Sequence, residues 1–220
     1  MNLTTVVGTC DSYLDLINGF STLYERYFEP NIETLIVSET EVLDIPKYNF
    51  ITPGKKAWGE RILKALSETQ TEYVFFVLED YYLSQLLTTE YIEYLLKFMD
   101  NHSVNKIALT TVPDFANYEY LESINTMHKI SPNSPWLTSI QPAIWRKSEL
   151  LKFLKPEYSP WDFEMIGSNE AKNNIENYFV AKLDKPIYFN MVRQGKVPSP
   201  GWKEFLKEQN LTQYDSTLRI

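Results

Sequence analysis

The sequence predicts an α/β protein in which helices flank a mostly parallel central sheet. Short β-branched and aromatic runs alternate along the chain with segments whose apolar residues recur at helical spacing. These runs are almost continuously apolar, as expected for strands that are buried on both sides. The chain has 220 residues, of which 44% are hydrophobic and 15% aromatic, which is enough for one sizeable core. We therefore expect a single domain spanning residues 1–220.

The first half of the chain follows this alternation regularly. Apolar residues at helical spacing predict helices from Leu14 to Tyr27, over residues 55–68 and over residues 88–101, where Thr88 can act as N-cap. Between them, β-branched and aromatic runs predict strands at residues 3–7, 33–38, 48–51, 73–78 and 105–112.

The second half is less regular. Residues 113–135 contain three prolines and predict a long loop with at most one short strand, at 126–130. Residues 136–145 are strand-like, and residues 147–154 and 159–175 predict helices, the second with Pro160 in its first turn. A strand near 186–192 is expected to close the core.

Composition excludes several classes of protein. The net charge of −8, from 21 basic and 29 acidic residues, argues against a nucleic-acid binder. A single cysteine and two histidines exclude an internal disulfide and a cysteine-built zinc site, so any metal would be a hard cation held by oxygen. The chain shows no secretory signal and no apolar run long enough for a transmembrane segment. We expect a cytoplasmic protein.

The residues that follow the strands are the first candidates for a site. In open parallel sheets, ligands bind outside the carboxyl ends of the strands. The first strand is followed by Thr9, Cys10, Asp11, Ser12 and Tyr13, and the strand at 73–78 by Glu79, Asp80, Tyr81 and Tyr82. Asp11 and Ser12 could instead simply cap a helix.

Glu79 and Asp80 need a separate explanation, because adjacent carboxylates repel each other. The repulsion amounts to about 4 kcal/mol at about 4 Å with an effective dielectric constant of about 20. A cation, or a donor such as Arg61, would relieve it. Alternatively, the two side chains reach water on opposite sides of the strand.

Two further groups are candidates. In "SPWDFE", Asp162 and Glu164 lie two residues apart, so only one of them is expected to face a site. Compensation of the helix dipole would explain both acids, but Trp161 beside a carboxylate suits a sugar-binding wall with a general base. Farther along, Arg193 and Lys196 flank a glycine in a basic loop that could cover a diphosphate or be ordinary surface.

Together these segments resemble a family of small bacterial GT-A glycosyltransferases of capsular and lipopolysaccharide biosynthesis. The matching segments, in order and spread over nearly the whole chain, are "VVGTCDSYLDL", "AWGERILKAL", "YVFFVLEDYYL", "IQPAIWRKSELL" and "SPWDFE". The resemblance implies a single GT-A-like (Rossmann-like) domain, with a nucleotide-sugar-binding half at 1–112 and an acceptor-binding and catalytic half at 113–220. It implies a UDP- or dTDP-sugar donor and a glycan or lipid-linked acceptor in surface polysaccharide synthesis. A lipid-linked acceptor would bring the protein into peripheral contact with the inner face of the membrane.

The resemblance also implies roles for individual residues. Asp80, with Glu79 beside it, would hold a divalent cation (Mn²⁺ or Mg²⁺) or the diphosphate, and Glu164 would be the base of an inverting enzyme, with Asp162 as second choice. The sequence departs from a strict DxD motif, because the two acids are adjacent and Tyr82 stands where a second acid is expected, so metal dependence stays open. The remaining residues expected to bind the nucleotide sugar are Thr9, Cys10, Asp11, Ser12, Tyr13, Trp58, Arg61, Tyr81, Trp161, Arg193 and Lys196.

Two other functions stay open. A glycoside hydrolase would also use paired carboxylates. A non-catalytic carbohydrate-binding protein could use tryptophans as a stacking surface, namely Trp58, Trp136, Trp145 and Trp161. A nucleotidyltransferase is disfavoured, because the 7 glycines form no glycine-rich phosphate loop.

Overall fold

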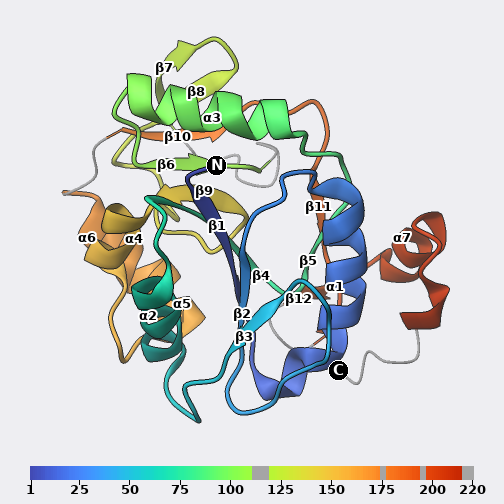
Figure 1. Cartoon of the computed structure of the whole chain (residues 1–220). Helices are drawn as coiled ribbons and strands as arrows, with labels where there is room; N and C mark the ends of the chain where they lie inside the picture. The colour runs from blue at the N-terminus through green and yellow to red at the C-terminus, as the bar shows by residue number, and fades with distance from the viewer. Residues whose placement is uncertain (111–118, 174–176, 194–196, 215–220) are drawn as a thin grey trace.

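The computed structural model describes residues 1–110, 119–173, 177–193 and 197–214. In this part of the chain a nine-stranded sheet runs through the molecule in the order β3-β2-β1-β4-β9-β6-β10-β8-β7 (Figure 1). Only β9 and β8 run against the other strands, so the expected mostly parallel sheet is confirmed. The strands are β1 (Leu3–Gly8), β2 (Thr34–Val37), β3 (Asn49–Ile51), β4 (Tyr73–Leu78), β6 (Lys106–Ala108), β7 (Tyr120–Ile124), β8 (Met127–Ile130), β9 (Ala143–Arg146) and β10 (Tyr178–Ala181).

Helices cover both faces of this sheet (Figure 1). One face packs against α1 (Leu14–Tyr27), α3 (Thr89–Asn101) and α7 (Trp202–Glu208). The other packs against α2 (Trp58–Glu68), α4 (Lys147–Phe153) and the helical segment α5–η3–α6. Each face has its own apolar cluster, which confirms the predicted layer arrangement.

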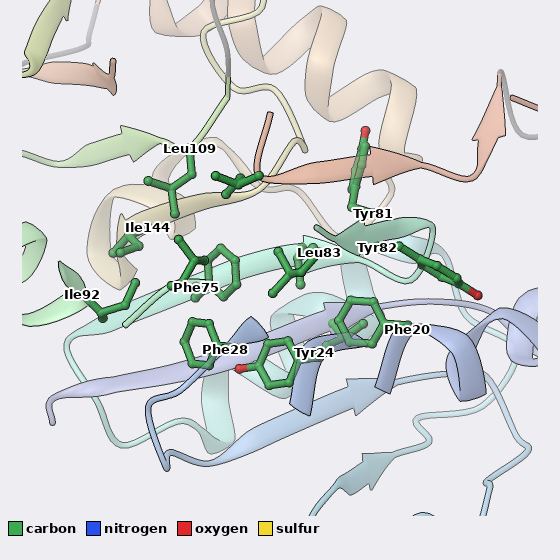
Figure 2. Close-up of a cluster of buried hydrophobic side chains, with 14 of the residues drawn as sticks. Phe20, Tyr24, Phe28, Phe75, Tyr81, Tyr82, Leu83, Ile92, Leu109 and Ile144 are labelled. Carbon is green, nitrogen blue, oxygen red and sulfur yellow. The ribbon is translucent and has the colours of Figure 1, made fainter. Parts of the chain in front are cut away.

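The apolar run of β4 supplies both clusters. Successive side chains of a strand point to opposite faces, so Tyr73, Phe75 and Val77 enter the first cluster while Val74 and Phe76 enter the second. Figure 2 shows Phe75 facing the aromatic side chains of α1, and the rings of Phe28 and Phe75 stack with centroids 5.4 Å apart. Burial on two sides explains why this strand shows no polar alternation.

The elements predicted in the first half are present, with boundaries shifted by a few residues. The predicted cap of α3 is confirmed, because the backbone N–H of Tyr91 donates to Thr88 Oγ1 at 3.1 Å. The strand predicted at 105–112 is shorter: β6 ends at Ala108, and residues 111–112 lie outside the described part of the chain.

Several predictions for the second half are wrong. The segment 113–135 contains two strands, β7 and β8, which form a hairpin at the sheet edge. Four of the five residues of β7 are exposed, so its sequence carries little apolar signal. The core is closed by β10, whereas the strand predicted at 186–192 is β11 (Tyr188–Asn190), which pairs outside the main sheet with β5 (Tyr81–Leu83).

The remaining differences lie near the predicted helix at 159–175. That helix is divided into α5 (Pro160–Asp162), a π-helical turn η3 (Phe163–Gly167) and α6 (Ser168–Ala171). In the strand-like segment 136–145, only the last residues join β9. Short elements complete the described chain: η1 (Asp11–Tyr13), β12 (Val192–Arg193), β13 (Val197–Pro198) and η4 (Thr212–Tyr214). No helix within the described ranges is long and apolar enough to cross a bilayer.

Candidate active site

A cavity of about 440 Å³ opens where β1 and β4 end. The two strands are parallel neighbours with Gly8 in register with Leu78, so their carboxyl ends meet at one edge of the sheet. The volume of the cavity is typical of ligand sites. Ten of the residues predicted from the sequence line it: Thr9, Cys10, Tyr13, Trp58, Arg61, Glu79, Asp80, Tyr81, Trp161 and Glu164.

The first turn of α2 forms one wall through Trp58 and Arg61. A Cβ added to Gly8 would lie 3.3 Å from Trp58 Nε1 and 3.1 Å from Leu78, so this glycine lets the indole pack against the end of β1. Arg61 is 5% exposed and donates from one terminal nitrogen to the carbonyl of Thr9 at 2.5 Å. Neither Trp58 Nε1 nor Arg61 Nε has a hydrogen-bond partner among the described residues. Both atoms are buried donors beside a cavity.

Glu79 is a buried acid at the end of β4. Its side chain is 7% exposed, and its backbone N–H donates to the carbonyl of Gly8 at 3.4 Å. Burial, followed by the neighbouring charge of Asp80, raises the pKa of Glu79 well above its ordinary value, and the positive charge of Arg61 acts in the opposite direction. Arg61 therefore eases the repulsion between the two acids through its charge.

Asp80 points an unpaired oxygen into the protein. Its carbonyl accepts from the backbone N–H of Met191 at 2.8 Å, which fixes the backbone at the cavity floor. Its Oδ1 is buried and has no hydrogen-bond partner among the described residues. Burial, together with the negative charge of Glu164, raises the pKa of Asp80 to about 7. This carboxyl group needs either a proton or a cation.

Glu164 lines the cavity from the π-turn η3. Single π-helical turns inside α-helices are frequent at functional sites. Glu164 Oε1 accepts from the backbone N–H of Ile140 at 3.0 Å and from Ser139 Oγ at 3.2 Å. Burial raises the pKa of Glu164 despite these bonds. Within the described residues, both hydrogen bonds to this carboxylate end on Oε1, and Oε2 accepts none.

Asp11 lies outside the cavity lining and holds a loop. Its carboxylate accepts from the backbone N–H groups of Glu39, Thr40 and Glu41 and from Thr40 Oγ1. Burial opposes ionisation, but the hydrogen bonds from Thr40 and its neighbours together outweigh it and lower the pKa of Asp11 to about 2. Ser12 is exposed and also lies outside the lining. Neither side chain caps the following helix by a hydrogen bond.

Asp162 is likewise absent from the cavity lining. It forms a capping box with Ser159 at the start of α5: Asp162 accepts from the Ser159 backbone, and Ser159 Oγ accepts from the Asp162 backbone. The hydrogen bonds that the Ser159 hydroxyl and backbone N–H donate to the Asp162 carboxylate lower its pKa. Lys196 lies outside the described residues, and of Arg193 only the backbone is described, in β12.

Six lining residues were not predicted. They are Gly8, Leu78, Ile140, Pro160, Asn190 and Val192. Four of them immediately precede or lie within a motif already singled out, so a wider reading of those motifs would have included them. Asn190 and Val192 reach the site because β11 pairs with β5, a pairing across about a hundred residues that no local pattern reveals.

The arrangement combines an acidic floor with buried donors on one wall. Besides burial, the negative charge of Glu164 raises the pKa of Asp80, and both residues line the cavity with carboxylate oxygens. Within the described ranges, no three potential ligands among histidine, cysteine, aspartate and glutamate gather to form a complete metal site. A divalent cation that keeps waters and binds substrate phosphates needs only one or two carboxylates. The unpaired Asp80 Oδ1, with the carboxylates of Glu79 and Glu164 in the same cavity lining, fits such an ion.

Comparison with known proteins shows a similarity of fold. No family model and no curated protein matches the sequence. The structure of S. aureus TarS 1–349 in complex with UDP is similar, with a TM-score of 0.62 and 18% identity over 96% of this chain and 64% of that one. TarS 1–349 in complex with UDP-GlcNAc gives a TM-score of 0.61 and 17% identity over 99% and 70%. The TarS 1–349 crystal structure gives a TM-score of 0.60 and 18% identity over 86% and 60%. The chain thus spans less than two thirds of that structure, and its fold is GT-A-like.

Proposed function

We propose that this chain is a glycosyltransferase that moves a sugar from a nucleoside-diphosphate sugar, first of all a UDP-sugar, to a hydroxyl of a glycan or lipid-linked acceptor. The observation that carries the proposal is the cavity at the ends of β1 and β4, which joins buried donors to three acids, Glu79, Asp80 and Glu164. The fold supports it, because similar structures were solved with UDP and with UDP-GlcNAc.

The wall of α2 and the loop after β1 would hold the nucleotide. Trp58 Nε1 and Arg61 Nε are buried without partners among the described residues, and leaving a buried donor unpaired costs about 1–3 kcal/mol. Carbonyl oxygens of a base or oxygens of a phosphate would satisfy both donors. Thr9, Cys10 and Tyr13 line the same side of the cavity and would enclose the nucleoside.

Asp80 would hold a divalent cation, with Glu79 supporting it. Such an ion would offset negative charge on the departing nucleoside diphosphate. Without an ion the buried Asp80 carboxyl group keeps its proton up to pH values near 7, since its pKa is raised to about 7. Binding of the ion would therefore displace a proton from this side chain.

Glu164 would be the general base of a single displacement. The acceptor oxygen forms a bond to the anomeric carbon as the bond to the diphosphate breaks, and the hydroxyl proton passes to Glu164. Its Oε1 is held by Ser139 and Ile140, which leaves Oε2 for the acceptor. The raised pKa makes Glu164 a stronger base than an ordinary glutamate. Displacement from the opposite side inverts the anomeric configuration.

Trp161 would form the acceptor wall. Its side chain is 56% exposed and yet lines the cavity three residues before Glu164. A large aromatic ring held at the mouth of a polar cavity offers a stacking surface for a sugar ring. Asp162 is the matched control for Glu164, because it is an acid of the same segment whose carboxylate is used by Ser159.

The test measures transfer from a panel of UDP- and dTDP-sugars by the wild type and by Glu164→Gln, Asp80→Asn and Asp162→Asn. Loss of the base is expected to lower kcat by about 10²- to 10⁴-fold, whereas Asp162→Asn keeps the wild-type rate. Full activity of both Glu164→Gln and Asp80→Asn would refute the assigned roles.

Binding experiments separate the alternatives. UDP with Mn²⁺ is expected to raise the melting temperature, while free sugars leave it unchanged. Release of free sugar from an oligosaccharide without any nucleotide would instead indicate a hydrolase. Stabilisation by glycans alone would indicate a binding protein.

A further inference from the structure

Lys106 is a buried lysine for which the proposed reaction has no role. It is the first residue of β6 and is 1% exposed. Its Nζ lies 4.5 Å from the ring centroid of Trp145 and 5.8 Å from that of Tyr178, on the two neighbouring strands. Lysine is almost never fully buried without a partner. A specific contact must therefore offset the free-energy cost of burying its ammonium group.

That contact is the backbone of the turn before β9. Lys106 Nζ donates to the carbonyl of Leu137 at 2.7 Å. One residue later, Thr138 Oγ1 donates to the carbonyl of Phe163 at 2.6 Å, which ties the same turn to η3. The backbone N–H of Thr138 also donates to Ser168 Oγ at 3.0 Å, at the start of α6.

The turn ends on Glu164. Ser139 Oγ and the backbone N–H of Ile140 both donate to Glu164 Oε1. Residues 137–140, which we call the brace, therefore connect Lys106 at one end to the Glu164 carboxylate at the other. Lys106 Nζ donates to Leu137 and not to Glu164, so it acts on that carboxylate only through the brace and through its charge.

We propose that Lys106 is a positioning residue for Glu164 and that it acts by fixing the brace. The inference rests on the proposed function, in which Glu164 takes the acceptor proton. A base must lie within hydrogen-bond reach of the proton it abstracts, and a misplacement of about 1 Å can lower the rate about 100-fold. Thr138 and Ser139 set the other two contacts of the same turn.

Charge supports the same assignment. The positive charge of Lys106 lowers the pKa of Glu164, against the effect of burial. Burial in turn lowers the pKa of Lys106 to about 7, and the negative charge of Glu164 opposes this change. The two groups thus favour each other's ionised forms, as expected for a lysine kept beside a functional carboxylate.

The experiment uses Lys106→Met, which keeps an unbranched apolar stem but has no donor and no charge. We expect kcat of sugar transfer to fall about 10- to 100-fold, with the Kd for UDP and Mn²⁺ unchanged. Lys147→Met is the matched control, because Lys147 Nζ also donates to a backbone carbonyl, that of Thr69 at 2.6 Å, and does not line the cavity. This control is expected to keep the wild-type kcat.

A double-mutant cycle with Ser139→Ala identifies the route. If both residues act on Glu164 through the brace, kcat of the double variant should be no more than about 2-fold below kcat of the less active single variant. The inference would be overturned if the fold-reductions of kcat in the two single variants multiply in the double variant. A wild-type kcat for Lys106→Met would also overturn it. If Lys106→Met does not fold, Thr138→Val replaces it in the same cycle and decides by the same criteria. Full activity of Glu164→Gln would instead overturn the proposed function itself.

Discussion

Replacing Lys106 with methionine should stabilise the protein near neutral pH and make its stability less dependent on pH. Lys106 is 1% exposed, and burial lowers its pKa from 10.5 to about 7. Between these two values the unfolded chain binds a proton that the folded chain does not. The free energy of unfolding of the wild type therefore rises with pH across this range.

The size of the effect follows from the two pKa values. Each pH unit well inside the range contributes about 1.4 kcal/mol. Because the folded lysine is still half protonated at pH 7, the wild type gains about 2 kcal/mol between pH 7 and pH 9 from this group alone. Methionine carries no proton and gains nothing. The variant loses the bond to Leu137, which offsets about 1–3 kcal/mol of its advantage at every pH.

Urea unfolding of both proteins at pH 7, 8 and 9 measures this difference. The stability advantage of Lys106→Met over the wild type should shrink by about 2 kcal/mol from pH 7 to pH 9. Contributions from tyrosines and from Cys10 cancel, because both proteins contain them. Ile107→Val, in the same strand and without a titrating group, should differ from the wild type by a constant of about 1 kcal/mol. If the free energies of unfolding of Lys106→Met and the wild type change with pH in parallel, the reasoning is refuted.

Three other predictions concern the cavity and its support. Gly59→Ala should lower the free energy of unfolding by about 2 kcal/mol or more, because its Cβ would lie 2.0 Å from the Lys155 carbonyl oxygen; an unchanged urea midpoint would contradict this close approach. Calorimetric Mn²⁺ affinity of the wild type should fall about fivefold from pH 7 to pH 6, because a proton competes at Asp80, whose pKa is about 7. Equal affinity at the two pH values would exclude Asp80 as the ligand. Trp161→Ala should raise the acceptor KM while changing stability by less than about 0.5 kcal/mol, since the side chain is 56% exposed; a large loss of stability would show that the ring packs structurally.

Local patterns were sufficient for the first half of the fold. The run at 73–78 predicted a strand buried on two sides, and β4 supplies both apolar clusters. Its acids were expected at the mouth of a ligand site, and Glu79 and Asp80 line the cavity. Such features depend on neighbours in sequence or on the common direction of adjacent parallel strands, which apolar spacing reveals.

Long-range pairing and irregular turns were not predictable in this way. The three-residue strand β5 follows the acids directly and exists only because β11 pairs with it. The π-turn that carries Glu164 interrupts the predicted helix at 159–175. Its first residue, Phe163, accepts a hydrogen bond from Thr138 of the brace, a contact distant in sequence. Lys106 sits in an apolar strand as a lone charge, and its partner lies 31 residues away in the chain.

The most direct test of the account is the rate of sugar transfer from a UDP-sugar by Glu164→Gln beside that of Asp162→Asn. The two acids lie two residues apart, yet only Glu164 lines the cavity, while Asp162 is held in the capping box with Ser159. We expect Glu164→Gln to bind UDP and Mn²⁺ with wild-type affinity but to transfer the sugar at least about 100-fold more slowly. Asp162→Asn should transfer the sugar at the wild-type rate. The reverse order of the two rates, or equal rates, would contradict the account.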